Sequence, residues 1–329
     1  MNRLAIIIVS YNTRALLPAC LASIKAATAA ANGSFSVEVL VIDNASEDGS
    51  AAMVASDFPN VRLTPLSENI GFTRGNNLAL AQLGFDPRPR SASSTNRAVS
   101  SAMPDQPDYV LLLNPDTVLR RDTLTQLVDF MEVTPAAGAC GPALAYGTGD
   151  FQHAAFRFPG LFQIWLDLFP LQGVPGAQRL RNSRFNGRYG DALWQDRAPF
   201  PVDFVLGASM FVRGATICQI GGLDEGYFMY CEEMDWALRM HEAGWGVYIV
   251  PWVNVTHFEG QSSRQVRWPA FVELWRSRLR FYGKHADRYP LWYLWLVRGL
   301  LRGGLAWRSR AIRRAFASGA VSGEAAGDA

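Results

Sequence analysis

The sequence predicts an α/β fold built on a doubly wound sheet, and the first 145 residues carry the pattern. Three short runs are continuously apolar and rich in Val, Ile and Leu, as expected for strands buried on both faces of a parallel sheet. They are Leu4–Val9, Val37–Ile42 and Tyr109–Leu113. Segments with helical spacing separate these runs. Such strand–helix alternation implies right-handed βαβ units, whose ligands bind at the carboxyl ends of the strands.

The chain is long and apolar enough for a sizeable core. Its 329 residues predict one large domain or two ordinary ones. A composition of 49% hydrophobic, 18% charged and 12% aromatic residues excludes a disordered, collagenous or disulfide-stapled protein. The four cysteines form no CxxC pair, which argues against a zinc knuckle or redox motif and favours a reducing compartment.

Spacing predicts the remaining elements of the first half. Val61–Leu63 is a weaker fourth strand, and residues 48–58 and 74–83 read as short helices. A further helix begins after Asp122, which we expect to act as its N-cap. The apolar positions that define the other helices are Leu17, Leu21 and Ile24 in one, and Leu124, Leu127, Val128 and Met131 in the other.

The second half of the chain is less regular. Residues 86–107 are rich in Pro and Ser without apolar periodicity, and predict a flexible surface insertion. From Phe151 to Pro201 the pattern is irregular and aromatic. Phe204–Arg213 and Gly246–Val250 then predict two strands that flank a helix beginning near Glu232.

The C-terminal part is basic and aromatic, although the net charge of the whole chain is only +2. Between residues 264 and 314, thirteen Lys and Arg stand against two acids. We expect a basic amphipathic helical extension over residues 261–316 and a disordered tail at 317–329. Either the extension lies on an anionic bilayer, or its aromatic side chains pack on the protein or on an oligomer partner. Its aromatic residues include Trp268, Trp275, Phe281, Tyr282, Trp292, Tyr293, Trp295 and Trp307.

The sequence predicts no targeting or membrane-spanning segment. The apolar run that ends at Val9 is too short for a signal-peptide core. Leu291–Leu305 falls short of the ~18 uncharged apolar residues of a span because Arg298 and Arg302 interrupt it. We therefore expect a cytoplasmic protein, with a peripheral contact at the inner face of the plasma membrane as the open alternative.

Two aspartates directly follow predicted strands. Asp43 ends the second strand in VIDNAS, and Asp116 follows the Tyr109 strand in LLLNPD. A carboxylate at a strand end can accept hydrogen bonds from a nucleobase or ribose, or bind a divalent cation that bridges phosphate oxygens. Asn, Asp and Pro are also common in ordinary turns. The repetition at two strand ends favours ligand binding.

An acidic pair, Glu232 and Glu233, marks the start of a predicted helix, where the helix dipole stabilises anions. Either one carboxylate is a general base in a cleft, or Glu232 only caps the helix while Asp235 and Arg239 form a surface ion pair. His257, in VTHFEG, is either a hydrogen-bonded structural residue or a metal ligand beside an aspartate.

Two glycine-bearing stretches could bring backbone close to a ligand. NIGFTRGNN at 69–77 joins a strand to a helix but is not the GxGxxG dinucleotide fingerprint. The sequence Gly207-Ala208-Ser209 would leave room for a sugar at a strand edge, although small residues also simply pack tightly.

Taken together and in order, these motifs resemble the inverting family 2 glycosyltransferases, and most closely their rhamnosyltransferase-like branch. The resemblance covers about residues 4–260 and implies a GT-A catalytic domain over residues 1–260, with a doubly wound mixed sheet flanked by helices. The motifs are IIIVSYN at 6–12, VIDNASEDGS at 41–50, NIGFTRGNN at 69–77, LLLNPD at 111–116, VLGASMFVRG at 205–214, GGLDEGYFMYCEEMDWALR at 221–239 and the later His257.

The resemblance also implies which residues bind the nucleotide-sugar donor. The implied contacts are Ser10, Tyr11 and Asn12 at the nucleoside, Asp43 at the base, and Asn69, Gly71 and Asn77 along the donor pocket.

By the same resemblance, Asp116 would hold Mg²⁺ or Mn²⁺ with His257 as a further ligand, and Glu233 would be the general base. The chain departs from the family at two of these positions. Glu233 stands where relatives usually carry Asp, which adds one methylene of reach. Asn114 is expected in the donor site where other branches carry the first Asp of DxD, so donor phosphates and water would complete the coordination of the metal.

The implied reaction is a single displacement that inverts the anomeric carbon, most specifically transfer of L-rhamnose from dTDP-rhamnose to a glycan or polyprenyl-diphosphate-linked acceptor in bacterial cell-surface polysaccharide synthesis. Other donors, such as a UDP-hexose or UDP-galactofuranose, remain open. A non-catalytic sugar-nucleotide binder and a nucleic-acid binder are the alternatives of a different class. We expect no nucleic-acid partner, because the basic extension lacks a recognition module, and an oligomer is left open.

Overall fold

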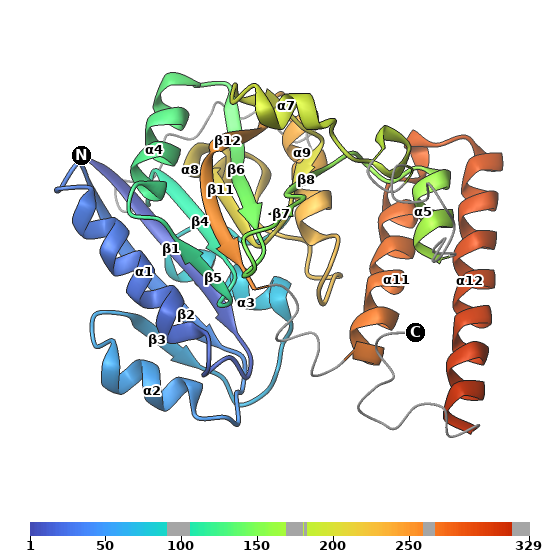
Figure 1. Cartoon of the computed structure of the whole chain (residues 1–329), viewed down its shortest axis with the longest axis horizontal. Helices are drawn as coiled ribbons and strands as arrows, with labels where there is room; N and C mark the ends of the chain where they lie inside the picture. The colour runs from blue at the N-terminus through green and yellow to red at the C-terminus, as the bar shows by residue number, and fades with distance from the viewer. Residues whose placement is uncertain (91–105, 169–179, 181–182, 259–266, 318–329) are drawn as a thin grey trace.

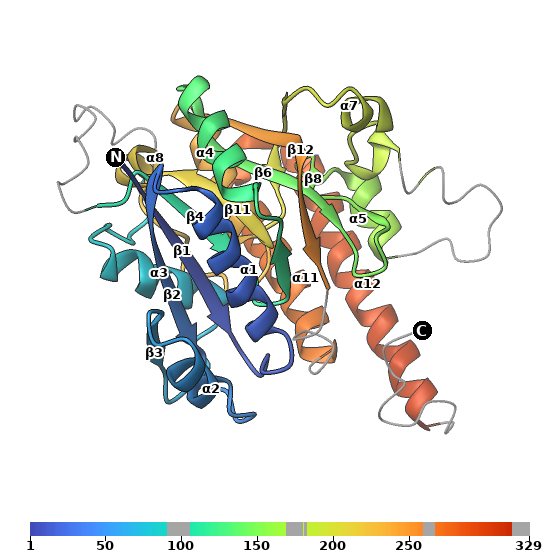
Figure 2. The same ribbon diagram turned by 60° about the vertical axis from the view of Figure 1, so that its left-hand side comes forward.

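The computed structural model describes residues 1–90, 106–168, 180, 183–258 and 267–317. Figure 1 and Figure 2 show a central sheet with helices on its faces and two long C-terminal helices beside it. The longest path through the sheet has the strand order β3-β2-β1-β4-β11-β6-β12-β5. The predicted α/β class with a mixed sheet is confirmed.

The first half of the sheet is parallel, and its central strand is β1 (Asn2–Ser10). This strand pairs on one side with β2 (Phe35–Asp43) and on the other with β4 (Tyr109–Leu113). The fourth strand, β3 (Arg62–Pro65), pairs with β2 at the edge. These are the four strands predicted from apolar runs. Burial on both faces explains the continuous runs of β1 and β4, and the lack of buried residues in β3 explains its weaker pattern.

The second half of the sheet is mixed because β11 (Ser209–Arg213) runs antiparallel to both of its neighbours, β4 and β6 (Ala137–Ala145). Next to β6 lie β12 (Gly246–His257) and then the short β5 (Thr117–Leu119). The remaining short strands are β7 (Phe151–Gln152), β8 (Ala155–Phe156), β9 (Phe200–Pro201) and β10 (Phe204–Val205).

Two strand predictions were wrong in extent. Residues 204–213 are not one strand, because the chain leaves the strand conformation at Leu206-Gly207-Ala208 between β10 and β11. The strand predicted to end at Val250 continues to His257, across a register shift that follows Val250. Both departures lie at the edge of the sheet where the candidate site residues gather.

The predicted helices of the first half are present. They are α1 (Leu17–Ala30), α2 (Ser50–Asp57), α3 (Phe72–Gln82) and α4 (Thr123–Val133). Asp122 does precede α4, but its side chain makes no capping hydrogen bond and instead accepts one from the Gln126 side chain. In the second half, α8 (Gly214–Ile220) and α9 (Glu232–Glu242) pack on the sheet, and α5 (Leu161–Leu168), η2 (Arg184–Asn186) and α7 (Asp191–Gln195) lie in the irregular aromatic segment.

The described ends of the predicted insertion at 86–107 pack on the protein. The Arg90 backbone N–H donates to the Ile220 carbonyl at 2.8 Å, and the Arg90 guanidinium donates to the Cys218 carbonyl at 2.9 Å. At the other end, the Gln106 side chain donates to the Gly84 carbonyl. The remainder, residues 91–105, lies outside the described residues.

The C-terminal part is helical, as predicted, with α11 (Arg267–Lys284), η3 (Ala286–Arg288) and α12 (Leu291–Ala317). The aromatic side chains of α11 are buried against the rest of the protein: Trp275, Phe281 and Tyr282. Among the described side chains of α12, by contrast, Leu294, Val297 and Leu301 are buried, while five large apolar ones are exposed: Leu291, Trp292, Trp295, Leu296 and Trp307. Trp268 lies outside the described side chains. The two interpretations of the aromatic extension therefore divide between the two helices.

Within the part of the chain that the structure describes, none of the helices is both long and apolar enough to cross a membrane.

Candidate active site

The carboxyl ends of β1, β2 and β4 lie in register at one edge of the sheet. Ser10 pairs with Asp43 at the ends of β1 and β2, and Ile7 pairs with Leu112 between β1 and β4. Because β11 is antiparallel to β4, its first residue, Ser209, lies opposite Leu113 at the same edge. The topology therefore brings together strand-end residues that are far apart in the sequence.

Two loops at this edge are joined through Asn12, whose φ of 51° lies in the left-handed region that Asn tolerates. Its backbone N–H donates to Ser46 Oγ at 2.9 Å, and its side-chain oxygen accepts from the Glu47 N–H at 2.8 Å. The predicted nucleoside contacts Ser10 and Tyr11 precede it in the same loop, with Ser10 buried and Tyr11 half-buried. Asn12 thus fixes the position of the loop.

Asp43 is buried and has one carboxylate oxygen to offer a ligand. Its Oδ2 accepts from the Ser46 N–H at 3.0 Å. Its Oδ1 is buried with no hydrogen-bond partner. A buried carboxylate oxygen without a donor is costly, and an N–H or hydroxyl of a bound nucleoside would satisfy it.

The segment at 69–77 is held by protein contacts. Gly71 has a φ of +88°, and a Cβ there would lie 2.6 Å from the Phe228 carbonyl oxygen, so glycine is required by the approach of another loop. Asn77 is buried, and its amide donates to the Leu223 carbonyl and accepts from the Leu223 N–H, both at 2.9 Å. Asn69 is exposed and lines a cavity of about 290 Å³. Of the three, Asn69 has the side chain most open to a ligand.

Asp116 and His257, which are far apart in the sequence, lie side by side in the structure. Their side chains are both buried, and Asp116 Oδ1 lies 3.4 Å from His257 Nε2. His257 ends β12 opposite Thr117 of β5, which places it beside Asp116. The sequence predicted this pairing.

A further residue, Gln152, fixes the orientation of the His257 ring. His257 Nδ1 lies 3.1 Å from Gln152 Oε1, and a carbonyl oxygen accepts only from an N–H. In the neutral ring, Nε2 therefore turns its lone pair toward the Asp116 carboxylate. A lone pair that faces a carboxylate is repelled by it unless a proton or a cation lies between the two groups. A hydrogen-bond partner on the other ring nitrogen, such as Gln152 here, is usual for a metal-binding His. Sequence reasoning missed Gln152, which lies in the irregular segment without a motif.

The described residues contain no group of three or more His, Cys, Asp or Glu that could hold a metal ion. Asn114 lies beside the Asp116–His257 pair, with its backbone N–H donating to the Ala208 carbonyl at 2.9 Å. One carboxylate and one imidazole fit a divalent cation that takes its other ligands from a bound substrate and water.

Glu233 lies in the first turn of α9, after two residues with strained backbone. Tyr230 and Cys231 have φ values of 67° and 66°, in the left-handed region that non-glycine residues rarely adopt. Glu233 Oε2 is buried and has no hydrogen-bond partner. Burial raises the pKa of Glu233 to about 7, which suits a general base near neutral pH.

Glu232 is more deeply buried than Glu233. Burial, followed by the charge of Glu233, raises the pKa of Glu232 well above its ordinary value. Only Glu233 of the two lines the cavity of about 220 Å³ that opens beside the start of α9. Of the two glutamates, Glu233 is therefore the one that a ligand in this cavity could contact.

The loop between β10 and β11 connects Glu233 with the strand-end edge. A Cβ added at Gly207 would lie 3.8 Å from Glu233 Cβ, so the loop backbone packs against the Glu233 side chain. The next residue, Ala208, accepts the hydrogen bond from Asn114, two residues before Asp116. One short loop thus separates the candidate base from the candidate metal pair.

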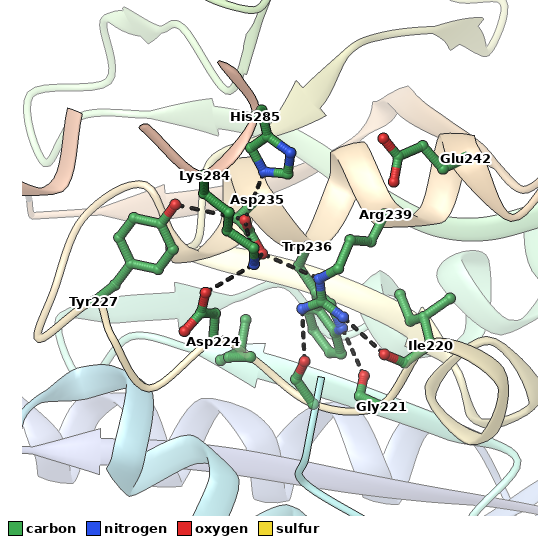
Figure 3. Close-up of polar contacts among 12 residues, drawn as sticks. Ile220, Gly221, Asp224, Tyr227, Asp235, Trp236, Arg239, Glu242, Lys284 and His285 are labelled. Atoms are coloured by element: carbon green, nitrogen blue, oxygen red, sulfur yellow. Dashed lines mark hydrogen bonds and ion pairs between the residues drawn. The ribbon is translucent and has the colours of Figure 1, made fainter. Parts of the chain in front are cut away.

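Asp235, which follows Glu233 on α9, is the centre of a buried ionic cluster that Figure 3 shows. Its carboxylate accepts from Arg239 Nε at 3.0 Å and from His285 Nε2 at 2.8 Å, and it lies 2.8 Å from Lys284 Nζ. Arg239 also donates to the carbonyls of Ile220 and Gly222. We call the set Asp235, Arg239, Lys284 and His285 the Asp235 cluster.

The Asp235 cluster corrects one interpretation of the sequence. Asp235 and Arg239 do form the i,i+4 ion pair, but the side chains are 0% and 5% exposed, so it is not a surface pair. Its cationic and hydrogen-bonding partners occupy the Asp235 carboxylate, which removes it as a candidate base. Sequence reasoning missed Lys284 and His285, because they lie about fifty residues away in a segment that looked like a membrane-binding extension.

Helix α11 also supports the loop that precedes the base. Ser277 Oγ donates to the Met229 carbonyl at 2.8 Å. Arg280 and Lys284 both pair with Asp224, at 2.9 and 2.7 Å. The strained turn before Glu233 is therefore held in place from the C-terminal part of the chain.

Comparison with known proteins identifies the family of the chain. A profile of the family described as "Glycosyltransferase like family 2" matches residues 2–280. Over 314 residues the chain is 31% identical to an N-acetylglucosaminyl-diphospho-decaprenol L-rhamnosyltransferase of Mycobacterium tuberculosis, covering 94% of this chain and 93% of that protein. The chain is a family 2 glycosyltransferase.

This glycosyltransferase is of the rhamnosyltransferase type. It is also 26% identical to the rhamnosyltransferase WbbL of Escherichia coli over 212 residues, which cover 64% of this chain and 69% of that protein. Its fold is similar to that of a mannosyltransferase from Pyrobaculum calidifontis solved in complex with GDP-Man and Mn²⁺, with a TM-score of 0.52 at 17% identity, covering 98% of this chain and 77% of that chain. The glycosyltransferase therefore has the GT-A fold.

Proposed function

We propose that this glycosyltransferase transfers L-rhamnose from dTDP-rhamnose to a hydroxyl group of a lipid-linked glycan in bacterial cell-surface polysaccharide synthesis, with inversion at the anomeric carbon. The observation that carries the proposal is the buried Glu233 carboxylate, which has a pKa near neutrality and opens onto a cavity one loop away from the strand-end residues. The M. tuberculosis relative, named for a diphospho-decaprenol acceptor, supports this choice of acceptor.

In the proposed reaction Glu233 removes the proton from the acceptor hydroxyl. The hydroxyl oxygen attacks the anomeric carbon of rhamnose on the face opposite the nucleotide, and the bond from that carbon to the diphosphate oxygen breaks. The nucleoside diphosphate leaves with the bonding electron pair. A single displacement of this kind needs one base and no covalent enzyme intermediate.

The donor is proposed to lie at the strand-end edge. Asp43 Oδ1, which has no hydrogen-bond partner in the protein, accepts a hydrogen bond from the nucleobase. The loop containing Ser10, Tyr11 and Asn12 borders the nucleoside. Asn69 and Gly71 follow along the donor pocket, and the Asn77 amide stays with the Leu223 backbone in support of that segment. Asn114 completes the donor side next to the Gly207 loop.

Asp116 and His257 are proposed to hold a Mg²⁺ or Mn²⁺ ion. The orientation of His257 by Gln152, with Nε2 turned toward Asp116, supports the assignment. When bound, such a cation stabilises negative charge that develops on a leaving diphosphate. Asp116 and His257 would hold the ion, and Gln152 would keep the His257 ring in place.

The exposed face of α12 is proposed to bind an anionic membrane surface peripherally, where a polyprenyl-linked acceptor resides. Trp295 is 81% exposed, and Trp292, Leu296 and Trp307 of the same helix are also exposed. Exposed Arg298, Arg302 and Arg310 lie among them on the same helix. Tryptophans with interspersed arginines match the interfacial region of an anionic bilayer.

Co-sedimentation with lipid vesicles tests the membrane proposal. We expect binding to phosphatidylglycerol vesicles but not to phosphatidylcholine vesicles, and a clear loss on replacing Trp295 and Leu296 by Ser. Leu193→Ser, at an exposed leucine on α7, is the matched control. Equal binding to both lipids, or stronger binding to RNA than to vesicles, would contradict the proposal.

A nucleotide-sugar panel tests the reaction. With Mn²⁺ and a sugar-diphospho-lipid acceptor, we expect nucleoside diphosphate release from dTDP-rhamnose in preference to a UDP-hexose or UDP-galactofuranose. We also expect the anomeric configuration of the product to be opposite to that of the donor. Release from a UDP sugar alone would move the donor assignment. Retention of configuration would exclude the single displacement.

A further inference from the structure

We propose that the cavity beside Glu233 holds a second anion-binding site, formed by Arg188 and Arg278, that receives the diphosphate of the acceptor. The inference rests on the proposed function and extends it by assigning residues that recognise the linker of the acceptor. Both arginines line the same cavity as Glu233, and they reach it from distant parts of the chain, one after η2 and one from α11.

Arg278 is fixed on one side and available on the other. Its Nη2 lies 2.6 Å from Asp167 Oδ2, and its guanidinium stacks 4.7 Å from the ring centroid of Trp275. The other terminal nitrogen, Nη1, is buried and has no hydrogen-bond partner. A buried guanidinium N–H without an acceptor is costly, and a phosphate oxygen is the acceptor that arginine geometry suits best.

Arg188 supplies the second positive charge. Its guanidinium lies 4.4 Å from the ring centroid of Phe156, and both residues line the cavity. The acids that line the same cavity are Asp167, already paired with Arg278, and Glu233, which burial keeps partly protonated near neutral pH. The cavity is therefore lined by two guanidinium groups and, outside the Arg278–Asp167 pair, by one carboxylate, that of Glu233.

The rest of the lining suits a sugar. Phe156, Phe204 and Leu206 offer apolar surface, and Gln163 Oε1 is buried without a hydrogen-bond donor. A pyranose ring needs both an apolar face and polar partners. A cavity of about 220 Å³ accommodates roughly one sugar with part of its linker. The acceptor sugar would then lie at Glu233 with its diphosphate at the arginines.

The donor also contains a diphosphate, so the location of the cavity decides whether it receives the diphosphate of the donor or that of the acceptor. Its lining includes none of the predicted donor residues Ser10, Asp43 or Asp116, and it is built instead from α5, α9, α11 and the segments around η2 and β10. Helix α5, which contributes Gln163 and Asp167, also packs against α12, where Leu168 meets Gly304. The cavity thus lies near α12, the helix proposed to meet the membrane, where a lipid-linked acceptor would enter.

Two matched acceptors test the site: a short-chain N-acetylglucosaminyl-diphospho-alkyl compound and the alkyl glycoside of the same sugar without the diphosphate. We expect Arg188→Gln and Arg278→Gln each to raise KM for the diphosphate acceptor by about tenfold or more, as loss of a charge-assisted hydrogen bond predicts. KM for the alkyl glycoside and for dTDP-rhamnose should change less than twofold. Arg278→Lys should recover part of the loss.

Asp167→Asn is the structural control, because it breaks the same ion pair while leaving Arg278 in place. It should keep the diphosphate KM within about threefold of the wild type. Equal losses with both acceptors, a higher donor KM in the arginine variants, or an Asp167→Asn effect as large as that of Arg278→Gln would overturn the assignment. A wild-type enzyme that transfers rhamnose to neither acceptor would instead contradict the proposed function.

Discussion

Replacing Asp235 by Asn should destabilise the protein by about 3–5 kcal/mol, the usual cost of removing one partner of a buried ion pair. The Asp235 side chain is fully buried, and its carboxylate contacts Arg239, Lys284 and His285. Asparagine keeps the shape but not the charge. Arg239 is 5% exposed and would remain buried without its counter-ion.

The pH dependence of stability should change with the same substitution. Burial by itself raises the pKa of Asp235, but the hydrogen bond from His285 and the charges of Arg239 and Lys284 outweigh it and hold the pKa below its ordinary value of 3.8. Because the folded pKa is the lower one, the stabilisation is present in full above about pH 4 and is lost as the pH falls toward the folded pKa.

Urea unfolding followed by tryptophan fluorescence, at pH 7 and at several values from 5 down to 3, measures both effects. The control is Glu38→Gln, which removes a pair with Arg62 that is almost half exposed on both sides and should cost less than about 1 kcal/mol. An Asp235→Asn cost as small as that of the control, or an unchanged acid dependence, would refute the reasoning.

Three further predictions concern the reaction. Glu233→Gln should leave donor affinity within about twofold and lower kcat by about 10²–10⁴-fold, whereas Glu232→Gln should retain more turnover. Stopped assays of nucleotide release measure both rates. An unchanged rate for Glu233→Gln would show that another residue is the base. In the wild type, kcat/KM should rise with pH through about 7, because the base acts in its ionised form and the pKa of Glu233 is raised to about 7 by burial; a flat profile would argue against it. Asp116→Ala should abolish transfer, and EDTA should inactivate the wild type until Mn²⁺ is restored, so full activity in EDTA would exclude the proposed metal site.

The strands β1 and β4, and the second half of β2, could be predicted because they are buried on both faces. That requirement leaves a continuous apolar run, and it explains why Tyr109–Leu113 has the same bounds in the sequence prediction and in the structure. The strand-end aspartates could be singled out for the same reason, since parallel strands place their carboxyl ends at one edge. Contact between Asp116 and His257 was expected through the resemblance rather than from spacing.

The antiparallel half was harder to predict. β6 has the sequence AGACGPALA, whose glycines and proline are depleted in strands. It forms because its neighbours pair with it on both sides and because Trp245 packs where a Cβ at Gly138 would lie, at 2.6 Å. Tertiary packing overrides local preference at such a strand.

The residues around Glu233 show a different limit of sequence reasoning. Lys284, His285, Arg188 and Arg278 carry no motif, and their partners lie far away in the sequence. The basic composition of the C-terminal part predicted a surface role, yet several of its cationic side chains form ion pairs within the protein. Their partners are Asp167, Asp224 and Asp235. Composition records the sign of a charge but not the side of the helix on which it lies.

Helix α11 is better understood as part of the candidate active site than as part of an appended module. A boundary at residue 260 remains a prediction, but α11 supports the turn before Glu233 through Ser277, ties α9 down through Lys284, and contributes Arg278 to the cavity. The family profile likewise extends to residue 280, inside α11. The N-terminal sheet supplies the proposed donor residues, and α11 supplies Arg278 of the proposed acceptor site. In the proposed reaction the two substrates would therefore meet at Glu233. Acceptor preference could then change through α5 and α11 while the strand-end donor residues stay the same.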